Sequence, residues 1–398
     1  MRTYNPDEAM SRSQKNSLFV EMYLEDNYLF RRNQLSGKIE FRSRMGDTPF
    51  RPLTKEAINS IVIRAKREDV GEGCNPRTDI EEYIHSEEIP LFNPIQDYLS
   101  ALPSWDGIDH VSALFSRLPE ISPEQSAFLR IWLHSVVAHW LQMDALHGNE
   151  CVLTLIGDQG CGKTTFFARL LPPQLREYYL DHINLSNKFD KDMALTNNLL
   201  VNLDELDAVR PSQHAALKQT LSKNKVNARP VYGLTQEDRP RFASFVATTN
   251  NRHPLVDTTG SRRYLCIEIP KQQLIDNDGD IDYQQLYAQV IYELRELQAP
   301  YWFSNDEVVR IQQLNQNYQE QKNLMDMITT FFRKPAPDES CTRLSSTEIL
   351  RLLSEEYPSV ACTQKAKIQL GIAMKRLGFD SHYTNGRKVY DAVLYKSQ

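Results

Sequence analysis

The chain has 398 residues, of which 41% are hydrophobic and 25% are charged, and its formal net charge is −6. A chain of this length is too long to fold around a single ordinary hydrophobic core, so we predict a soluble globular protein with two or three domains. The negative net charge excludes a uniformly basic coat for nucleic acid, but it leaves room for a basic surface on one part of the chain.

Neither a membrane segment nor an oxidising compartment is indicated. No run of 18 or more apolar residues is present, and the chain opens on polar residues without an apolar leader. The six cysteines are scattered without a Cys-x-x-Cys pair, which favours free thiols over disulfides or zinc. We therefore expect a cytoplasmic protein that has no membrane contact.

The first module is expected at residues 1–108. It contains two amphipathic pieces, SLFVEMYLEDNYLFRR and KEAINSIVIRAKRE, followed by a turn-rich acidic stretch, and this predicts an α+β or helical domain. A helix is predicted over residues 122–146, with Ser122 as its N-cap and Pro123 in its first turn. We expect its histidines and tryptophans to serve core or interface packing rather than to bind a ligand.

The chemical core is expected at residues 109–275. From residue 151 to 270, short apolar runs alternate with helical stretches. This order, with nearly continuous apolar strands, is typical of an α/β fold with a parallel sheet covered on both faces. A polar helical connector is predicted over residues 276–335.

The last module is expected at residues 336–398, and it begins within a linker-like KPAPDES segment. Its pattern predicts two helices and then two strands about an Asn385-Gly386 turn. Helices closed by a hairpin favour a winged-helix-like domain.

Residues 157–164 fit the pattern G-x-x-x-x-G-K-[ST], between an apolar strand and a helical stretch. Glycines at these positions let backbone N–H groups and the helix N-terminus face phosphates, while Lys163 reaches the β- and γ-phosphates and Thr164 holds Mg²⁺. We therefore predict that ATP and Mg²⁺ are the cofactors. The residues expected to bind nucleotide are Gly157, Asp158, Gln159, Gly160, Cys161, Gly162, Lys163, Thr164 and Thr165.

Two acids follow the apolar strand predicted at LLVNLDELD, residues 199–207. Asp204 suits Mg²⁺, directly or through water, and Glu205 can polarise the attacking water. Asp207 fits a helix cap as well as a catalytic role. Solvated acids at a strand end would give the same pattern in isolation, so their roles depend on the glycine loop upstream.

A third apolar strand, FASFVATTN, ends in two threonines and Asn250. Asn250 leaves the strand before Asn251, and its amide could orient the water or contact the γ-phosphate. A turn-forming asparagine would have the same sequence.

Two arginines, Arg262 and Arg263, lie on a glycine-containing turn before another predicted strand. A rigid cationic projection of this kind suits a phosphate, and in ring-forming ATPases it reaches the nucleotide of the neighbouring subunit. A surface ion pair is the alternative.

Residues 218–241 carry six basic side chains against two acidic ones. The segments VNARPVYG and RFASFVATT could pair as a hairpin with its tip near residues 235–239. A basic hairpin with an aromatic side chain suits single-stranded DNA, although a solvated surface hairpin would have the same composition. The residues assigned to DNA in this segment are Lys223, Lys225, Arg229, Tyr232 and Arg239.

The order of these parts resembles the superfamily 3 type of AAA+ helicase, a P-loop ATPase. Five segments resemble more closely the virulence-associated E (VapE) family of phages and mobile genetic elements: LPSWDGIDH, LDELD, ARPVYG, ATTN and DTTGSRRY. The resemblance runs from about residue 85 to residue 270.

This resemblance implies an ATP-dependent, hexameric DNA helicase or translocase that acts in replication, with ATP held between subunits. On that template, the catalytic residues are Lys163, Asp204, Glu205, Asn250 and either Arg262 or Arg263 as the finger that acts on the neighbouring subunit. Members of the family are often fused to a primase. The sequence shows no such domain, so the implied partners include a separate primase or another replisome protein.

The tail gives a second indication of DNA. Residues 363–398 carry seven basic side chains against two acidic ones. A basic helix and wing could dock on duplex DNA through Lys375, Arg387 and Lys388, although such modules also dock on proteins.

Three other functions fit part of the pattern. A DNA-binding replication initiator or regulator could use nucleotide only as an assembly switch, but it would not need both Asp204 and Glu205. A protein-remodelling AAA+ ATPase would share the catalytic residues without stimulation by DNA. A small-molecule kinase is the least favoured, because the arginine turn and the basic hairpin would have no function in it.

Overall fold

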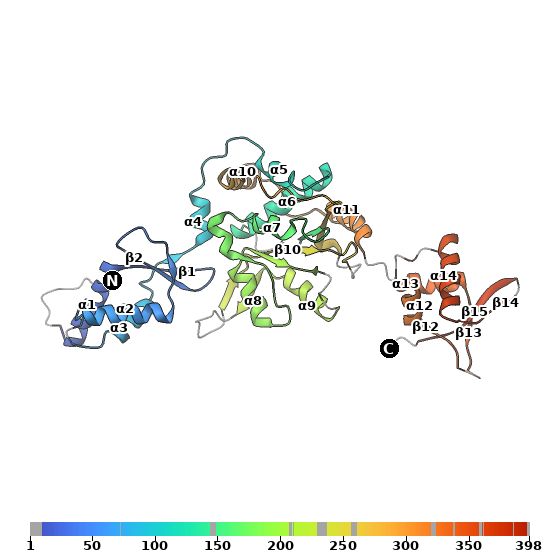
Figure 1. Cartoon of the computed structure of the whole chain (residues 1–398), viewed down its shortest axis with the longest axis horizontal. Coiled ribbons are helices and arrows are strands. Elements are labelled where there is room, and N and C mark those ends of the chain that lie inside the picture. Colours follow the sequence, from blue (N-terminus) through green and yellow to red (C-terminus); the bar gives the residue numbers. More distant parts are fainter. Residues whose placement is uncertain are drawn as a thin grey trace. The chain divides into compact units, whose positions relative to one another are not determined.

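In the computed structural model the chain forms two compact units, Met1–Gln319 and Glu320–Gln398 (Figure 1). No helix among the described residues is long and apolar enough to cross a membrane. The structure describes residues 10–71, 73–143, 149–206, 209, 211–228, 237–255, 261–319, 324–336, 339–357, 360, 362–384 and 386–395.

The N-terminal part of the first unit is an α+β module. Its sheet has the strand order β3-β2-β1-β4, and its core contains Tyr28, Phe30 and Phe41 from the sheet and Ile61 from α2. Ser11 begins α1 with a capping box, and Thr54 caps α2. The elements are α1 (Arg12–Asn27), β1 (Tyr28–Asn33), β2 (Ile39–Ser43), β3 (Arg51–Pro52), α2 (Lys55–Arg67), α3 (Arg77–His85) and β4 (Leu91–Phe92).

A five-stranded sheet with the order β11-β5-β10-β7-β6 forms the centre of the first unit. Each strand of this sheet pairs in parallel with its neighbours, as predicted for an α/β fold. Every residue of β5, β7 and β10 is buried, which explains the nearly continuous apolar runs. The strands are β5 (Val152–Ile156), β6 (Tyr179–Leu180), β7 (Leu200–Leu203), β10 (Ser244–Thr249) and β11 (Tyr264–Glu268).

Helices cover both faces of this sheet, and successive strand residues alternate between the two cores. Leu153, Leu155 and Val246 pack with residues of α5, α6, α7 and α10, whereas Phe245 and Ala247 pack with residues of α8 and α9. The two layers are visible above and below the sheet in Figure 1. The helices are α4 (Pro94–Ser100), α5 (His110–Phe115), α6 (Pro123–Trp140), α7 (Lys163–Ala168), α8 (Lys188–Asn197), α9 (Pro211–Leu221), α10 (Tyr283–Arg295) and α11 (Asn305–Asn315), with 3-10 turns η1 (Pro173–Tyr178), η3 (Ser261–Arg263) and η4 (Gln316–Tyr318).

Helix α6 begins as predicted, because Ser122 forms a capping box with Gln125. It ends at Trp140, earlier than the predicted residue 146, and Gln142 just beyond adopts a left-handed φ of 52°. The packing expected for its histidines and tryptophans is confirmed, since all four are buried: Trp132, His134, His139 and Trp140.

The described residues of the second unit form three helices and a small sheet in which β15 lies between β12 and β13 and also pairs with β14. The two predicted helices and the final strand pair are present, and Thr384 pairs with Arg387 across the predicted turn. Helix α12 lies within residues 276–335, which were predicted as a helical connector, whereas the strands β12 and β13 were not predicted. The elements are α12 (Leu324–Phe331), β12 (Phe332–Arg333), β13 (Thr342–Ser345), α13 (Ser346–Glu356), α14 (Gln364–Arg376), β14 (Ser381–Thr384) and β15 (Arg387–Leu394).

Candidate nucleotide site

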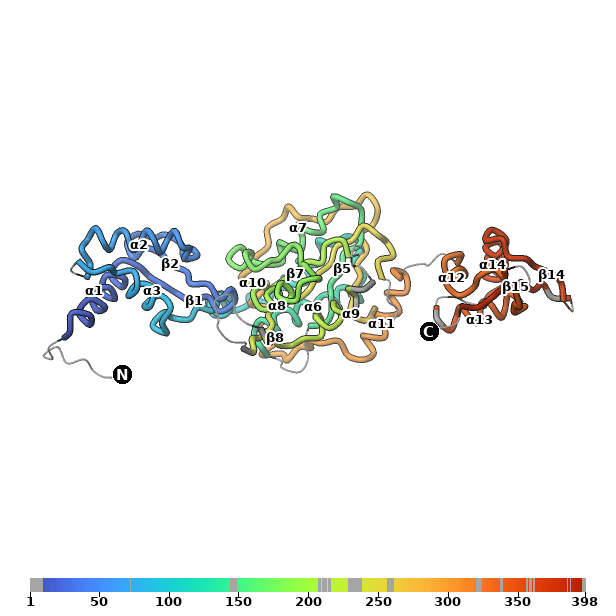
Figure 2. Tube along the Cα trace, turned by 90° about the horizontal axis from the view of Figure 1, so that it is seen from below, coloured from blue at the N-terminus to red at the C-terminus, as the bar shows by residue number. Residues whose placement is uncertain are grey.

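The glycine loop lies at the carboxyl edge of the central sheet, between β5 and α7 (Figure 2). The N–H of Gly157 donates to the carbonyl of Thr249 on the neighbouring strand, at 3.1 Å. A Cβ atom at Gly157 would lie 2.9 Å from Cβ of Ile269, so a larger residue does not fit there. Gly160 and Gly162 have φ angles of 83° and 93°, which L side chains rarely adopt.

Lys163 connects this loop to the strand beside it. Its ammonium group is buried and donates to the carbonyls of Gly157 at 2.7 Å and Asp158 at 2.9 Å, and to Oδ1 of Asn250 at 2.9 Å. The cation is thus fixed at the loop by three oxygen acceptors, none of which is a carboxylate.

Most of the remaining loop residues lie at the surface or close to it, but Cys161 is buried. Asp158, Gln159 and Gly160 are exposed, whereas Thr164 is half-buried at the start of α7. A segment after β11 covers the other side of the loop, where Ile275 N–H donates to the carbonyl of Cys161 at 3.0 Å. The loop is therefore held from two sides, with its tip open.

Asp204 and Glu205 follow β7 directly, and both are exposed. The parallel register places Leu203 beside Ala247, so Asp204 meets the next residue of β10. There the Thr248 hydroxyl donates to Oδ1 of Asp204 at 2.5 Å. Glu205 has a φ of 51°, an uncommon backbone conformation for a residue with a side chain.

The two asparagines after β10 have different environments. Asn250 accepts from Lys163, whereas Asn251 forms a local turn in which its Oδ1 accepts from the N–H of His253 at 2.9 Å. The structure therefore brings Asn250 to the glycine loop and uses Asn251 for the chain reversal.

Sequence reasoning missed two polar residues near this edge. Asp181 follows β6, and Asn202 within β7 donates weakly to its carboxylate at 3.4 Å. The signal in the sequence was slight, because β6 has only two residues. Oδ1 of Asn202 is buried and has no hydrogen-bond partner among the described residues.

No group of three His, Cys, Asp or Glu side chains in the described part of the chain could by itself hold a metal ion. Mg²⁺ does not require such a group, because it is often bound by one or two protein oxygens together with phosphates and water. The Thr164 hydroxyl and the Asp204 carboxylate are oxygen donors of the kind that Mg²⁺ takes.

The two arginines of the predicted turn lie directly before β11. They are therefore at the amino ends of the strands, whereas the glycine loop is at the carboxyl ends. Arg263 forms an ion pair with Glu150 at 3.3 Å, and its side chain is 14% exposed. Arg262 is exposed and makes no hydrogen bond or ion pair within the described residues. Because Tyr264 pairs with Val152 at the start of β5, the length of that strand, roughly 16 Å, separates the turn from the glycine loop of the same chain.

A basic hairpin is present, but the prediction of its second strand and of its tip was wrong. β8 (Lys225–Ala228) pairs with β9 (Glu237–Pro240), so residues 237–240 are strand rather than tip. The predicted partner, residues 241–249, supplies β10 instead, since this fully buried strand bonds to β5 and β7 on its two sides. Arg229 and Tyr232 lie outside the described residues.

Not all of the basic side chains of this segment face solvent. Lys225 is exposed beside Asp238 at 2.6 Å, and Lys223 pairs with the buried Asp192 at 2.9 Å. Arg239 is only 8% exposed and donates to the carbonyl of Leu35 at 2.9 Å. The assignment of Arg239 to DNA contact is therefore withdrawn, because its guanidinium connects the core to the N-terminal module.

The tail residues assigned to DNA lie on α14 and β15 of the second unit. Lys375 is exposed in the last turn of α14, and Lys388 is exposed on β15 with its ammonium group 5.2 Å from the ring centre of Tyr390. Arg387 begins β15.

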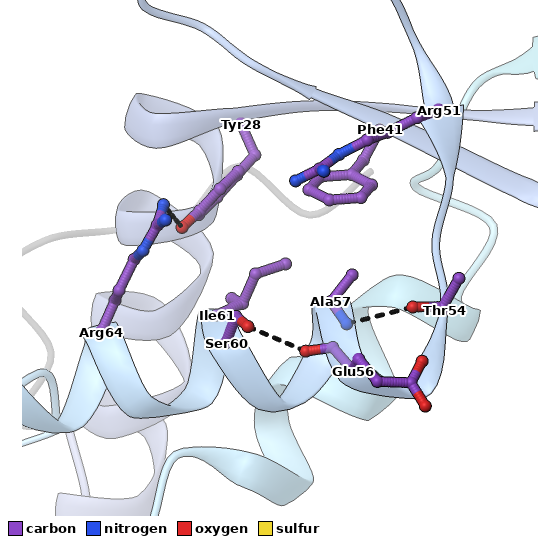
Figure 3. A pocket seen from close by; sticks show the side chains of 9 residues that line it. All are labelled: Tyr28, Phe41, Arg51, Thr54, Glu56, Ala57, Ser60, Ile61 and Arg64. Carbon is purple, nitrogen blue, oxygen red and sulfur yellow. Dashed lines mark hydrogen bonds between the residues drawn. The ribbon is translucent and has the colours of Figure 1, made fainter.

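A separate pocket of about 240 Å³ lies between α2 and the N-terminal sheet (Figure 3). Tyr28 and Phe41 lie on its sheet side; the guanidinium group of Arg51 lies over the ring of Phe41, and that of Arg64 lies beside the hydroxyl group of Tyr28. The arginines favour an anionic ligand, but Glu56 is also part of the lining. No residue of the glycine loop contributes to this pocket.

A family comparison decides the relationship. The pattern of the Virulence-associated protein E-like domain matches residues 99–320, more than half of the chain. The chain belongs to the virulence-associated protein E-like family. The matched region of this VapE-like chain includes the glycine loop, the two acids after β7, Asn250 and the arginine turn.

Comparison with curated proteins gives no match. Among solved structures, an apo structure of the NrS-1 C terminal region is 12% identical, with a TM-score of 0.45, and covers 96% of the VapE-like chain and 100% of its own. An A form apo structure of the same region is 13% identical, with a TM-score of 0.42, and covers 95% and 99%. Structural similarity at these TM-scores and identities does not indicate a function for this chain.

Proposed function

We propose that this chain is an ATP-dependent DNA translocase or helicase that acts in the replication of a phage or mobile genetic element. Its core would be a P-loop ATPase of the superfamily 3, AAA+ type, and its second unit a winged-helix-like module. The observation that carries the proposal is the bridge from the glycine loop through Lys163 to Asn250, beside an Asp204 that is hydrogen-bonded to the same strand.

The roles of the loop residues follow from their positions. The exposed tip and its positive-φ glycines would place backbone N–H groups around phosphates. Lys163 would exchange its carbonyl acceptors for phosphate oxygens, to which a cation binds more strongly. Bound ATP would supply the γ-phosphoryl group that is transferred to water, with ADP as the leaving group. Mg²⁺ would offset the negative charge of the phosphates, and Thr164 and Asp204 would hold the metal.

Hydrolysis needs a water positioned opposite the leaving group. Glu205 is the candidate base, since it is exposed beside Asp204 at the end of β7. Asn250 lies within hydrogen-bond distance of Lys163, so it would respond to whatever that ammonium group binds. At the carboxyl edge of the sheet, Glu205 would thus activate the water and Asn250 would respond to the presence of the γ-phosphate.

The arginine turn supports a shared site between copies. Arg262 lies at the edge of the sheet opposite the glycine loop of its own chain, so a neighbouring subunit is the better source of a phosphate for it. Arg263 is held by Glu150. We therefore assign the finger to Arg262, in a homo-oligomeric ring with ATP between subunits.

Single-stranded DNA would be held by the hairpin of β8 and β9, where Lys225 is exposed. Arg229 and Tyr232 belong to the same segment and stay part of this proposal. A separate primase or replisome protein stays the expected partner.

The test measures ATP hydrolysis with and without single-stranded DNA, and the mass in solution with and without ATP. We expect stimulation by DNA and a larger assembly with ATP. Lys163→Ala should abolish turnover, whereas Lys188→Ala, at an exposed lysine that begins α8, should leave it unchanged.

Glu205→Gln separates the motor from the alternative, an initiator or regulator that uses nucleotide only as an assembly switch. A motor loses turnover and translocation in this variant but retains ATP binding. If Glu205→Gln assembles and supports replication as the unaltered chain does, and hydrolysis is negligible even on DNA, the switch is the correct function.

A further inference from the structure

Helix α14 of the second unit has two faces of different character. Leu370, Ala373 and Met374 are buried and pack against the other elements of the unit. On this side Gly371 lies close to β15, since a Cβ atom there would be 3.3 Å from the hydroxyl oxygen of Tyr390. The helix is thus anchored by one face only.

The opposite face of α14 exposes two isoleucines one turn apart. Ile368 is 59% exposed and Ile372 is 52% exposed. Neither helix propensity nor core packing requires a β-branched apolar residue at such positions, because isoleucine is a weaker helix former than the polar straight-chain residues. Two exposed isoleucines at a spacing of four residues therefore favour contact with a partner.

Basic and amide side chains surround these isoleucines. At 100° per residue, the exposed arc of the helix has Ile368 and Ile372 near its middle. The other exposed residues of this arc are Gln364, Lys365, Gln369, Lys375 and Arg376. Helix α14 has no acidic residue, and Asp380 is the single acid between residues 363 and 384.

The neighbouring elements limit where an anionic partner can approach. Helix α13 carries three glutamates and one arginine, so its surface does not favour a polyanion. The β14–β15 pair instead presents Tyr383, which is 77% exposed, directly opposite Lys388 in the strand register. Among the described helices of this unit, only α14 therefore carries a net positive charge, and the adjoining strand pair adds Lys388 beside it.

We propose that the exposed face of α14 binds the major groove of duplex DNA at a site rich in A·T base pairs. An α-helix is about 10–12 Å wide with its side chains, which fits a major groove of about 12 Å. The isoleucines would contact thymine methyl groups, and the glutamines would bind adenine edges in two hydrogen bonds. Lys365, Lys375 and Arg376 would contact phosphates.

This surface goes beyond the proposed motor and does not depend on it, because it lies outside the ATP site and needs no nucleotide. An apolar protein partner would use the isoleucines but has no reason to require a face free of acids. A polyanion accounts for both features, and the thymine methyl group accounts for the apolar centre.

The experiment measures binding of the full chain, without ATP, to duplexes capped by hairpins at both ends, so that no single strand is available. Equal-length A·T-rich and G·C-rich duplexes are compared over a range of salt concentrations. We expect a preference for the A·T-rich duplex. A double variant, Ile368→Ser with Ile372→Ser, should reduce that preference about tenfold.

A second double variant, Lys375→Ala with Arg376→Ala, separates phosphate contact from base contact. It should lower the dependence of log K on log salt by about two, because each phosphate contact releases roughly one counterion, and it should retain the A·T preference. Arg351→Ala on α13, also an exposed basic residue on a helix of this unit, is the control and should change neither quantity.

Three outcomes overturn the proposal. The first is an unchanged preference in the isoleucine variant, and the second is an unchanged salt dependence in the basic variant. The third is that replacing the isoleucines lowers the mass of the assembly in solution while duplex binding is unaffected. This result would make the face a contact between copies of the chain. ATP turnover on single-stranded DNA is measured in parallel and should be unaltered in the Arg351→Ala control.

Discussion

The Nζ atom of Lys163 lies 2.9 Å from Oδ1 of Asn250, although 87 residues separate them in the chain. The contact exists because β5 and β10 are parallel neighbours, so that the loop after one strand and the polar residue after the other reach the same edge of the sheet. An occupant of the loop that attracts Lys163 would therefore alter the environment of Asn250 directly.

Asn250→Ala should lower ATP turnover about a hundredfold or more, because a group that positions the water or the γ-phosphate acts mainly in the transition state. ATP affinity should change little. Asn251→Ala is the matched control, since this side chain is engaged in a local turn. Turnover that is equal in Asn250→Ala and the unaltered chain would contradict the assigned role.

Arg262→Ala should bind ATP normally and hydrolyse it about a thousandfold more slowly, which is the size of effect of a finger contributed by a neighbour. The decisive measurement mixes this variant with Lys163→Ala. Each chain alone lacks one half of every site, but in a mixed ring some interfaces combine an intact loop with an intact arginine, so activity should return on mixing.

Arg263→Ala provides the control for this experiment. It removes the partly exposed ion pair with Glu150 and should alter stability slightly without abolishing turnover. Loss of activity in Arg263→Ala together with normal activity in Arg262→Ala would exchange the two assignments. If mixing restores nothing, the site belongs to a single chain.

Much of the site could be predicted because it depends on short-range pattern. The glycine loop needs particular residues at fixed spacing between a strand and a helix, and an apolar run of five or six residues shows where each strand ends. Once the strands are parallel, the residues after them gather at one edge. Asp204 and Asn250 were found in this way.

Long-range burial could not be predicted from the same information. A count of charges gives Arg239 and Arg241 the same weight as Lys225, yet both arginines are buried. Arg239 donates to the carbonyl of Leu35 and to Oδ1 of Asn197, and Arg241 donates to backbone carbonyls such as that of Asn149. The hairpin partner was misassigned for a related reason, because residues 244–249 have strand propensity in either arrangement. Only the neighbouring strands β5 and β7 decide between them.

Arg241→Met should lower the free energy of unfolding by about 3 kcal/mol or more, because removing the donors leaves buried acceptors unpaired. The guanidinium is fully buried and donates to four backbone carbonyls, those of Asn149, Leu221, Lys223 and Ala243. Burial also lowers the pKa of Arg241 to about 10, so the group is still charged at neutral pH.

Denaturant unfolding of the Arg241→Met chain measures this loss. Lys225→Ala is the comparison within the same segment, since its exposed pair with Asp238 should contribute little to stability. Equal stability of the Arg241→Met variant and the unaltered chain would show that these carbonyls find other donors, or water.

A network of charges between α5, α6 and α10 should make the first unit sensitive to acid. Arg130 donates to Asp109 and, at 2.6 Å, to Glu293, which also lies 2.6 Å from His134. Burial acts to raise the pKa of Asp109, but hydrogen bonds from Arg130 and Gln289 outweigh it and lower that pKa. The pKa of Glu293 is lowered in the same way against its burial, by His134, Gln289 and Arg130.

A carboxyl group whose pKa is lower in the folded chain than in the unfolded chain binds fewer protons when folded. Its contribution to stability is therefore fully present above its ordinary pKa, about 4, and is lost as the pH falls through and below that value. Unfolding by urea at a series of pH values from 7 to 3 should show stability falling below about pH 4.5. Asp109→Asn should be less stable at pH 7 and should lose less on acidification, because the group that titrates has been removed. A variant that lost as much stability on acidification as the unaltered chain would place the acid sensitivity elsewhere.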